Sequence, residues 1–152
     1  MPSLLEQFTS LIHAFNKEKI EYAVCGGLAM AVHGFARATE DIDLLIQPDS
    51  LEKAFSVAKD EGYDIHGLDI SFKERAIEIR RVSKIDSDGE VLSLDLLLVT
   101  PHVQDVWDTR ESIDFLGAKL FVVSRDGLRK MKELAGRPQD KADIERLDNE
   151  ES

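Results

Sequence analysis

Two aspartates, Asp41 and Asp43, are the residues of this chain whose types and spacing point most directly to chemistry. They open the run DIDLLI, whose apolar residues predict a strand. Because side chains alternate between the two faces of a strand, both carboxylates point the same way, roughly 6–7 Å apart, while Ile42 and Leu44 face the core. Two carboxylates that project together suit a divalent cation carrying a nucleoside triphosphate.

A pair of glycines, Gly26 and Gly27, stands upstream at the end of another predicted strand, over residues 20–25. Alone, a glycine pair is most often only a turn, and an Asp-x-Asp before an apolar run is more often a solvated strand end than a metal site. Here a strand, the glycine pair, a short helix, an arginine and the Asp-x-Asp strand follow one another between Tyr22 and Ile46. This combination favours a site in which free backbone amides after the glycines receive phosphate.

This segment resembles the nucleotidyltransferase superfamily that shares its core with DNA polymerase beta. The matching residues are Gly26, Gly27, His33, Gly34, Arg37, Thr39 and the string from Asp41 to Leu44. Within the superfamily, the chain looks most like minimal bacterial proteins related to AbiEii-type toxins, whose tail is similar to KELAGRPQDKADI, residues 132–144. Many members of the superfamily carry Gly-Ser in place of Gly26-Gly27, so this chain lacks one hydroxyl contact to phosphate.

Asp95 is the candidate for a third carboxylate. In the strand predicted over residues 91–99, Leu94, Leu96 and Leu98 share one face and leave Asp95 on the other. A charge inside such an apolar run costs several kcal/mol unless it is paired or bound to a cation, so a salt-bridged or edge-facing aspartate is the alternative. In the resembling family a carboxylate on a later strand completes the cation site and takes the acceptor proton, a role that Asp95 matches by position.

The resemblance implies Mg²⁺-dependent transfer of a nucleoside monophosphate from a nucleoside triphosphate substrate. Asp41, Asp43 and Asp95 would be both the catalytic residues and the ligands of one or two Mg²⁺ ions.

Nucleotide binding is assigned to residues on both sides of these aspartates. Gly26 and Gly27 would cradle phosphate, and Arg37 would reach it from the loop before Asp41, unless it is an ordinary surface arginine. In the tail motif, Lys132 would contact the triphosphate together with Arg137; the alternative is a helix–turn–helix held by salt bridges. His33 is interpreted as a helix-end residue that satisfies carbonyls.

The elements that must position these residues alternate between helix and strand. Ser3 and Glu6 predict a capping box before a helix with one apolar face, from Leu4 to Phe15. Strands are expected over 20–25, 42–46, 76–82, 91–99 and 119–123, with a hairpin turn over 86–89. Helices are expected over 28–33, after 48–50, over 125–134, and around Ala142, Ile144 and Leu147. The predicted fold class is therefore α/β, with a small mixed sheet flanked by helices in a single domain, 1–152.

Composition limits the function classes. The 152 residues suit one domain, and the chain lacks an apolar stretch that could span a bilayer and a basic, apolar leader, so we expect a cytoplasmic protein with no membrane partner. The net charge of −11 disfavours broad adhesion to nucleic acid and favours a cationic acceptor or a basic protein partner. The single cysteine, Cys25, is expected to be a buried thiol.

The acceptor stays open at this point: RNA, a protein and a small cationic molecule are the classes that the sequence allows. The alternative hypothesis is a protein without catalytic activity, either a nucleotide-binding regulator or the antitoxin-like partner of a toxin pair. It remains open because the chain has no obvious extra helical domain to bind an acceptor.

Overall fold

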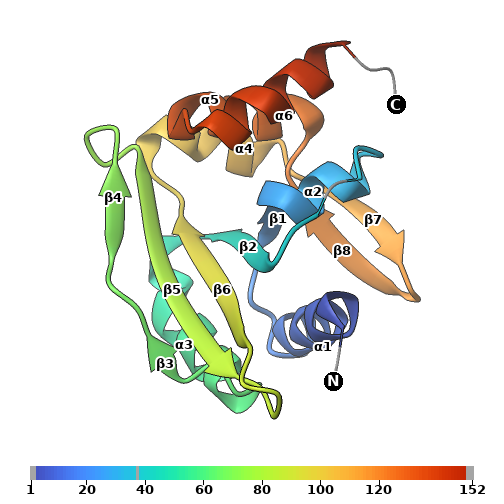
Figure 1. Cartoon of the computed structure of the whole chain (residues 1–152), viewed down its shortest axis with the longest axis vertical. Coiled ribbons are helices and arrows are strands. Elements are labelled where there is room, and N and C mark those ends of the chain that lie inside the picture. The colour runs from blue at the N-terminus through green and yellow to red at the C-terminus, as the bar shows by residue number, and fades with distance from the viewer. Residues whose placement is uncertain (1–2, 37, 150–152) are drawn as a thin grey trace.

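The computed structural model describes residues 3–36 and 38–149 and has one mixed sheet with helices packed around it (Figure 1). The strands are β1 (Ala23–Cys25), β2 (Asp41–Ile46), β3 (Ile65–His66), β4 (Ile70–Phe72), β5 (Ile77–Ile85), β6 (Val91–Leu98), β7 (Glu111–Phe115) and β8 (Ala118–Val122). Their order is β3-β5-β6-β2-β1-β8-β7, and β4 also pairs with β5. The predicted fold class is confirmed.

Two strand pairs are parallel, β2 with β6 and β1 with β8, and the others are antiparallel. The parallel pairs place β2 and β1 at the centre of the sheet, where every residue of β1 is buried. Segments that are distant in the sequence therefore meet in the middle of the molecule.

The helices are α1 (Leu4–Lys17), α2 (Gly26–Val32), α3 (Leu51–Asp60), α4 (Gln104–Asp108), α5 (Arg125–Ala135) and α6 (Pro138–Asn149), with short 3-10 turns at η1 (Pro48–Ser50) and η2 (Pro101–Val103). Helices α1 and α3 pack together along the sheet, whereas α4, α5 and α6 form a layer at its other end (Figure 1). Among the described residues, no helix combines the length and apolar character that crossing a membrane requires.

Helix α1 begins as the sequence predicts. The Ser3 side chain accepts a hydrogen bond from the Glu6 backbone, and the Glu6 side chain accepts from the Ser3 backbone. The buried residues of the helix, Phe8, Leu11, Ile12 and Phe15, lie along its apolar face. The cap and the periodic face act together, since a cap satisfies exposed amides while tertiary packing supplies most of the stability of a helix.

The predicted hairpin is present as β5 and β6, joined by the turn at Asp86. The Asp86 carboxylate accepts hydrogen bonds from the backbone amides of Asp88 and Glu90, and Gly89 takes a φ of +83° there. This turn pairs Ile85 with Val91 and so fixes the register of both strands.

Four strands and helices were not predicted, namely β3, β4, α4 and β7, and several boundaries differ, since β1 begins at Ala23 rather than at residue 20 and β5 continues to Ile85 rather than ending at residue 82. Helix α2 begins at Gly26 rather than at residue 28, so both glycines lie in its first turn. The unpredicted elements are short, and β3 is exposed over its whole length, so an apolar pattern of a few residues at most could mark them in the sequence.

Candidate functional site

A row of four polar side chains crosses the middle of the sheet. Cys25 on β1 is the Cα partner of Asp43 on β2, Asp43 is the partner of Asp95 on β6, and Asp95 is the partner of Arg81 on β5. Since directly paired residues of neighbouring strands project to the same face, the sheet itself brings two carboxylates and a guanidinium together. Asp41 lies two residues before Asp43 on β2 and therefore shares this face.

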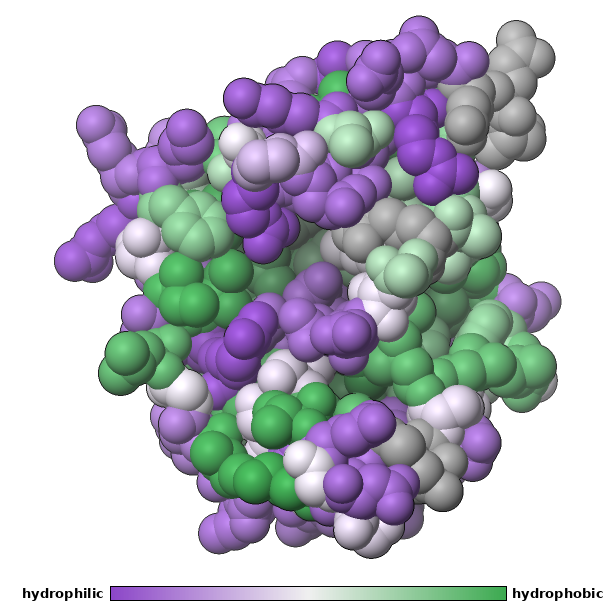
Figure 2. All heavy atoms as spheres, viewed as in Figure 1, coloured by the Kyte–Doolittle hydropathy of each residue, from purple (hydrophilic) through white to green (hydrophobic). Residues whose placement is uncertain are grey.

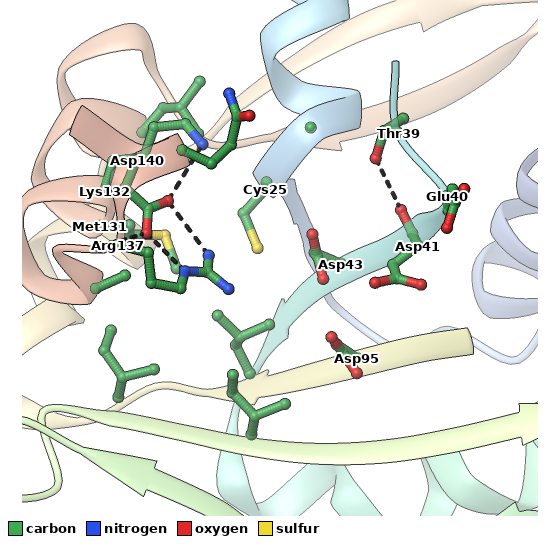
Figure 3. A pocket seen from close by; sticks show the side chains of 18 of the residues that line it. Cys25, Thr39, Glu40, Asp41, Asp43, Asp95, Met131, Lys132, Arg137 and Asp140 are labelled. Carbon is green, nitrogen blue, oxygen red and sulfur yellow. Dashed lines mark hydrogen bonds and ion pairs between the residues drawn. The ribbon is translucent and has the colours of Figure 1, made fainter. Parts of the chain in front are cut away.

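The row forms the floor of a cleft of about 440 Å³ between the sheet and α5. Figure 2 shows the molecule hollowed below the α5 and α6 layer. The three candidate aspartates and the tail residues lie at different ends of the cleft. In Figure 3, Asp41, Asp43 and Asp95 gather at one end, whereas Lys132, Arg137 and Asp140 gather at the other, with Cys25 between the groups. Apolar side chains of β4, β5 and β6 complete the lining, namely Phe72, Ile77, Ile79 and Leu97.

Gly26 and Gly27 border the same cleft, as expected. The backbone of Gly26 has a φ of +66°, a conformation that residues with a Cβ rarely adopt. A Cβ atom added to Gly26 would stand 1.9 Å from the Oδ2 atom of Asp43. Glycine is thus required at position 26 for two reasons, because the turn is left-handed and because the Asp43 carboxylate packs against it.

Asp95 lies on the cleft face and is salt-bridged, which is the alternative that the sequence allowed, while its role as a third metal-binding carboxylate stays a prediction. It lies beside Asp43 on the cleft face and is only 6% exposed, and it also pairs with Arg81. The Nε atom of Arg81 donates to Oδ1 of Asp95 at 2.6 Å, and Nη2 donates to Oδ2 at 2.9 Å. The same Nη2 atom lies 3.6 Å from Oδ2 of Asp41.

Arg81 is the site residue that sequence reasoning missed. The alternation of side chains along β5 could have identified it. Arg81 lies on the same face of this strand as Ile77 and Ile79, and both of these residues line the cleft. Combined with the turn at Asp86, this alternation places Arg81 opposite Asp95.

Burial, and then the charges of neighbouring carboxylates, raise the pKa values of Asp43 and Asp41. Burial, with the nearby charges of Asp95 and Asp41, raises the pKa of Asp43 from 3.8 to about 7. Burial and the charge of Asp95 also raise the pKa of Asp41, although Arg81 opposes this shift. The Asp43 carboxylate therefore has a proton affinity suited to exchange near neutral pH, and a cation in the cleft would favour its ionised form.

The donor set fits a divalent cation at Asp41 and Asp43. These carboxylates supply hard oxygen ligands, and the space left by Gly26 accommodates the Asp43 carboxylate within the cleft. Over residues 3–36 and 38–149, no group of three or more His, Cys, Asp or Glu side chains is arranged as a metal site. The third carboxylate, Asp95, is engaged by Arg81.

The tail residues form a buried ionic network beside the cleft. Lys132 is 4% exposed, and its Nζ atom lies 2.8 Å from Oδ2 of Asp143 and 3.8 Å from Oδ1 of Asp140. Asp140 also accepts a hydrogen bond from Nε of Arg137 at 2.7 Å, while the Arg137 side chain stays 66% exposed. The predicted salt-bridged turn is thus present, and both Lys132 and Arg137 also line the cleft.

The remaining residues singled out in the sequence are Arg37, His33 and Cys25. Arg37 lies outside the described residues. His33 caps the end of α2, where its Nε2 atom is 2.8 Å from the carbonyl oxygen of Val123, in agreement with its interpretation as a helix-end residue. Cys25 is buried, as expected, and burial holds the pKa of its thiol well above the usual value.

No family model and no curated protein matches this chain in sequence. Its structure, however, is similar to those of several solved proteins. The nucleotidyltransferase candidate TM1012 from Thermotoga maritima aligns with a TM-score of 0.65 at 15% identity over 97% of this chain and 93% of its own.

Two antibiotic-modifying enzymes are also similar in structure. The lincosamide antibiotic adenylyltransferase LnuA, bound to lincomycin, aligns with a TM-score of 0.59 at 15% identity, over 94% of this chain and 95% of its own. ANT(2'')-Ia, in complex with adenylyl-2''-tobramycin, aligns with a TM-score of 0.59 at 12% identity over 92% of this chain and 84% of its own. At such low identity the likeness establishes architecture, and the chain has the nucleotidyltransferase fold.

Proposed function

We propose that this protein is an Mg²⁺-dependent nucleotidyltransferase that moves a nucleoside monophosphate from a nucleoside triphosphate to a hydroxyl group of an acceptor. The observation that carries this proposal is the pairing of Asp43 with Asp95 on β2 and β6, beside Asp41 and facing the Gly26–Gly27 turn. Its nucleotidyltransferase fold agrees with this reaction class.

Each residue of the cleft has a chemical task in this reaction. Asp41 and Asp43 would hold the cation, which when bound neutralises negative charge on the triphosphate. Gly26 and Gly27 border the cleft in the first turn of α2, where backbone amides would receive phosphate. The exposed Arg137 guanidinium can hold phosphate oxygens with two parallel hydrogen bonds. Buried Lys132 contributes positive charge and holds Asp140, which in turn orients Arg137.

Asp95 is assigned as the general base. Each carboxylate oxygen has two lone-pair sites, so Asp95 can receive a proton while Arg81 occupies one site on each oxygen. In the transfer, the acceptor oxygen forms a bond to the α-phosphorus as the bond to the β-phosphate oxygen breaks. Pyrophosphate leaves, and the proton of the acceptor hydroxyl passes to Asp95.

We infer that the acceptor is a small cationic molecule. The cleft holds Glu40, Asp41, Asp43 and Asp95 at one end, and the chain carries a net charge of −11, which repels the phosphates of RNA. LnuA and ANT(2'')-Ia, whose structures carry an antibiotic or its adenylyl derivative, support this acceptor class.

The relation to AbiEii-type toxins also stays a proposal, supported by the tail residues Lys132, Arg137, Asp140 and Asp143 that contact one another beside the cleft.

One observation favours a second candidate function. Arg81 engages both oxygens of Asp95. This contact is also expected in a protein without catalytic activity, either a nucleotide-binding regulator or an antitoxin-like partner.

A labelling experiment tests these assignments. The purified protein is incubated with Mg²⁺ and each α-³²P-labelled nucleoside triphosphate, together with tobramycin, lincomycin, total RNA or a protein extract. We expect label on a cationic small molecule, and no label with Asp43→Asn. Label on RNA or protein would overturn the acceptor class while supporting the reaction, and tight nucleotide binding without any transfer would favour the regulator.

A further inference from the structure

We infer that Arg81 is a built-in substitute for a second divalent cation, so that the cleft takes a single ion, at Asp41 and Asp43. This inference rests on the proposed function and specifies how its cation site is built. In a site for two ions, the second would be shared between Asp95 and the aspartates of β2.

The position of the guanidinium supports this assignment. Arg81 donates to both oxygens of Asp95, at 2.6 Å and 2.9 Å, which is the bidentate geometry of strong arginine–carboxylate pairs. Its Nη2 atom also lies 3.6 Å from Oδ2 of Asp41. The guanidinium thus bridges the same two carboxylates that a shared cation would bridge.

The sheet fixes Arg81 in this position. Arg81 and Asp95 are Cα partners on antiparallel strands, so both backbones hold the side chains face to face. Asp95 is only 6% exposed, and a buried carboxylate that loses its partner pays a large desolvation cost. An incoming ion would have to displace the guanidinium from Asp95 and also from the neighbourhood of Asp41.

Asp43 is placed differently, and this difference leaves one cation position. In the described part of the chain, Arg81 forms ion pairs with Asp95 and Asp41, but none joins it to Asp43. The carboxylate of Asp43 instead packs against the Gly26 backbone, at the end of the cleft where Asp41 also lies (Figure 3). Arg81 would therefore act as a positioning residue, holding Asp95 where the second ion would otherwise hold it.

The test counts bound ions directly. Mn²⁺ replaces Mg²⁺, and protein-bound Mn²⁺ is measured by electron paramagnetic resonance and equilibrium dialysis, with and without the α,β-methylene analogue of each of the four common nucleoside triphosphates. We expect one ion per chain in the unmodified protein. We expect two ions, with the spin-coupled spectrum of a close pair, in Arg81→Met.

Two variants serve as controls. Arg80→Met changes the neighbouring arginine, which contacts Glu78 and Asp69 instead of the cleft carboxylates, and should bind one ion. Arg81→Lys keeps a positive charge opposite Asp95 and should also bind one ion. If Arg81→Met does not fold, the count in the unmodified protein decides, since one ion supports the inference and two overturn it.

The outcomes separate this inference from the proposed function. Two coupled ions in the unmodified protein would overturn the role of Arg81 and leave nucleotidyl transfer intact. A single ion in a folded Arg81→Met variant would also overturn it, because the second position would then not depend on Arg81. No bound ion in any variant, with or without nucleotide, would overturn the proposed function as well.

Discussion

Oδ2 of Asp43 lies 1.9 Å from the point where a Cβ atom on Gly26 would stand, so the Asp43 carboxylate can keep its position only while residue 26 is glycine. The contact joins the proposed phosphate-binding turn to the proposed cation site. A second glycine, Gly89, also has a positive φ, of +83°, but a Cβ there would meet nothing within 4 Å. Comparing the same substitution at the two glycines therefore separates the effect of backbone strain from the effect of displacing Asp43.

Gly26→Ala should destabilise the protein and also abolish stabilisation by Mg²⁺ and nucleotide, because the new methyl group displaces the Asp43 carboxylate. Gly89→Ala should cost only the strain of a left-handed residue, about 1–2 kcal/mol, and keep the ligand effect. Thermal unfolding with and without ligand measures both quantities. A normal ligand-induced rise in melting temperature for Gly26→Ala would contradict the assignment.

Asp43 should make stability depend on pH between 3.8 and about 7. Its pKa is raised in the folded protein, so in this window the folded state keeps a proton that the unfolded state has lost. The free energy of unfolding should therefore fall as pH rises through the window, and Asp43→Asn should remove this part of the slope. Urea unfolding at several pH values in this window measures the slope. If the free energies of unfolding of the two proteins changed in parallel with pH, Asp43 would not titrate there.

The affinity for Mn²⁺ should depend on pH in the opposite direction. Because the ion binds the ionised carboxylate in competition with the proton, its affinity should increase as pH rises toward and through about 7. Titration calorimetry at several pH values checks this. An affinity that does not vary with pH would place the ion away from Asp43.

Asp95→Asn should lower turnover by about 10²–10⁴-fold and leave nucleotide affinity nearly unchanged, since a general base acts on the acceptor in the transition state. Single-turnover transfer of labelled nucleoside monophosphate, with nucleotide affinity measured in parallel, gives the two quantities. Asp114→Asn is the matched control, because the Asp114 side chain is 91% exposed on β7, outside the cleft. Equal turnover in both variants would remove Asp95 from the mechanism.

Lys132→Met should destabilise the protein by about 3–5 kcal/mol, because it removes the Lys132 ammonium that lies 2.8 Å from the buried Asp143 carboxylate. Adding Asp143→Asn should restore part of this loss. Lys130→Met is the control, since the pair of Lys130 with Asp105 is partly exposed and should contribute at most about 1 kcal/mol. Urea unfolding of the unmodified protein, Lys132→Met, Asp143→Asn and the double variant checks the cycle, with Lys130→Met measured alongside, and strictly additive effects would show that Lys132 and Asp143 are not coupled.

Strong local patterns account for what could be predicted of the fold. The Ser3 cap, the apolar face of α1 and the alternation in β6 are signals within single segments, and the alternation alone places Asp95 on the face opposite Leu94 and Leu96. The strand β3 carries no such signal, because both of its residues are exposed and it forms by pairing with β5. The alternation in β7 is confined to Ile113 and Phe115, too short to identify a strand alone.

The residues of the site could also be predicted only where a local sequence pattern marks them. The types and alternation of Asp41, Asp43 and Asp95 mark them as candidates, but the parallel pairing of β2 with β6 depends on the whole sheet. Arg81 was within reach of the sequence, since counting back from the turn at Asp86 places it opposite Asp95. Its double contact with Asp95 and Asp41 depends on side-chain positions that no pattern encodes.

The pairing of Arg81 with Asp95 also bears on the order of folding. These residues belong to one hairpin and need only the turn at Asp86 to meet, and hairpins close in about 1–10 μs. Asp43 reaches Asp95 only when β2 docks beside β6, which closes a much longer loop. We therefore expect Asp95 to gain its counter-charge before the core assembles around it, so that this aspartate is never buried as an isolated negative charge.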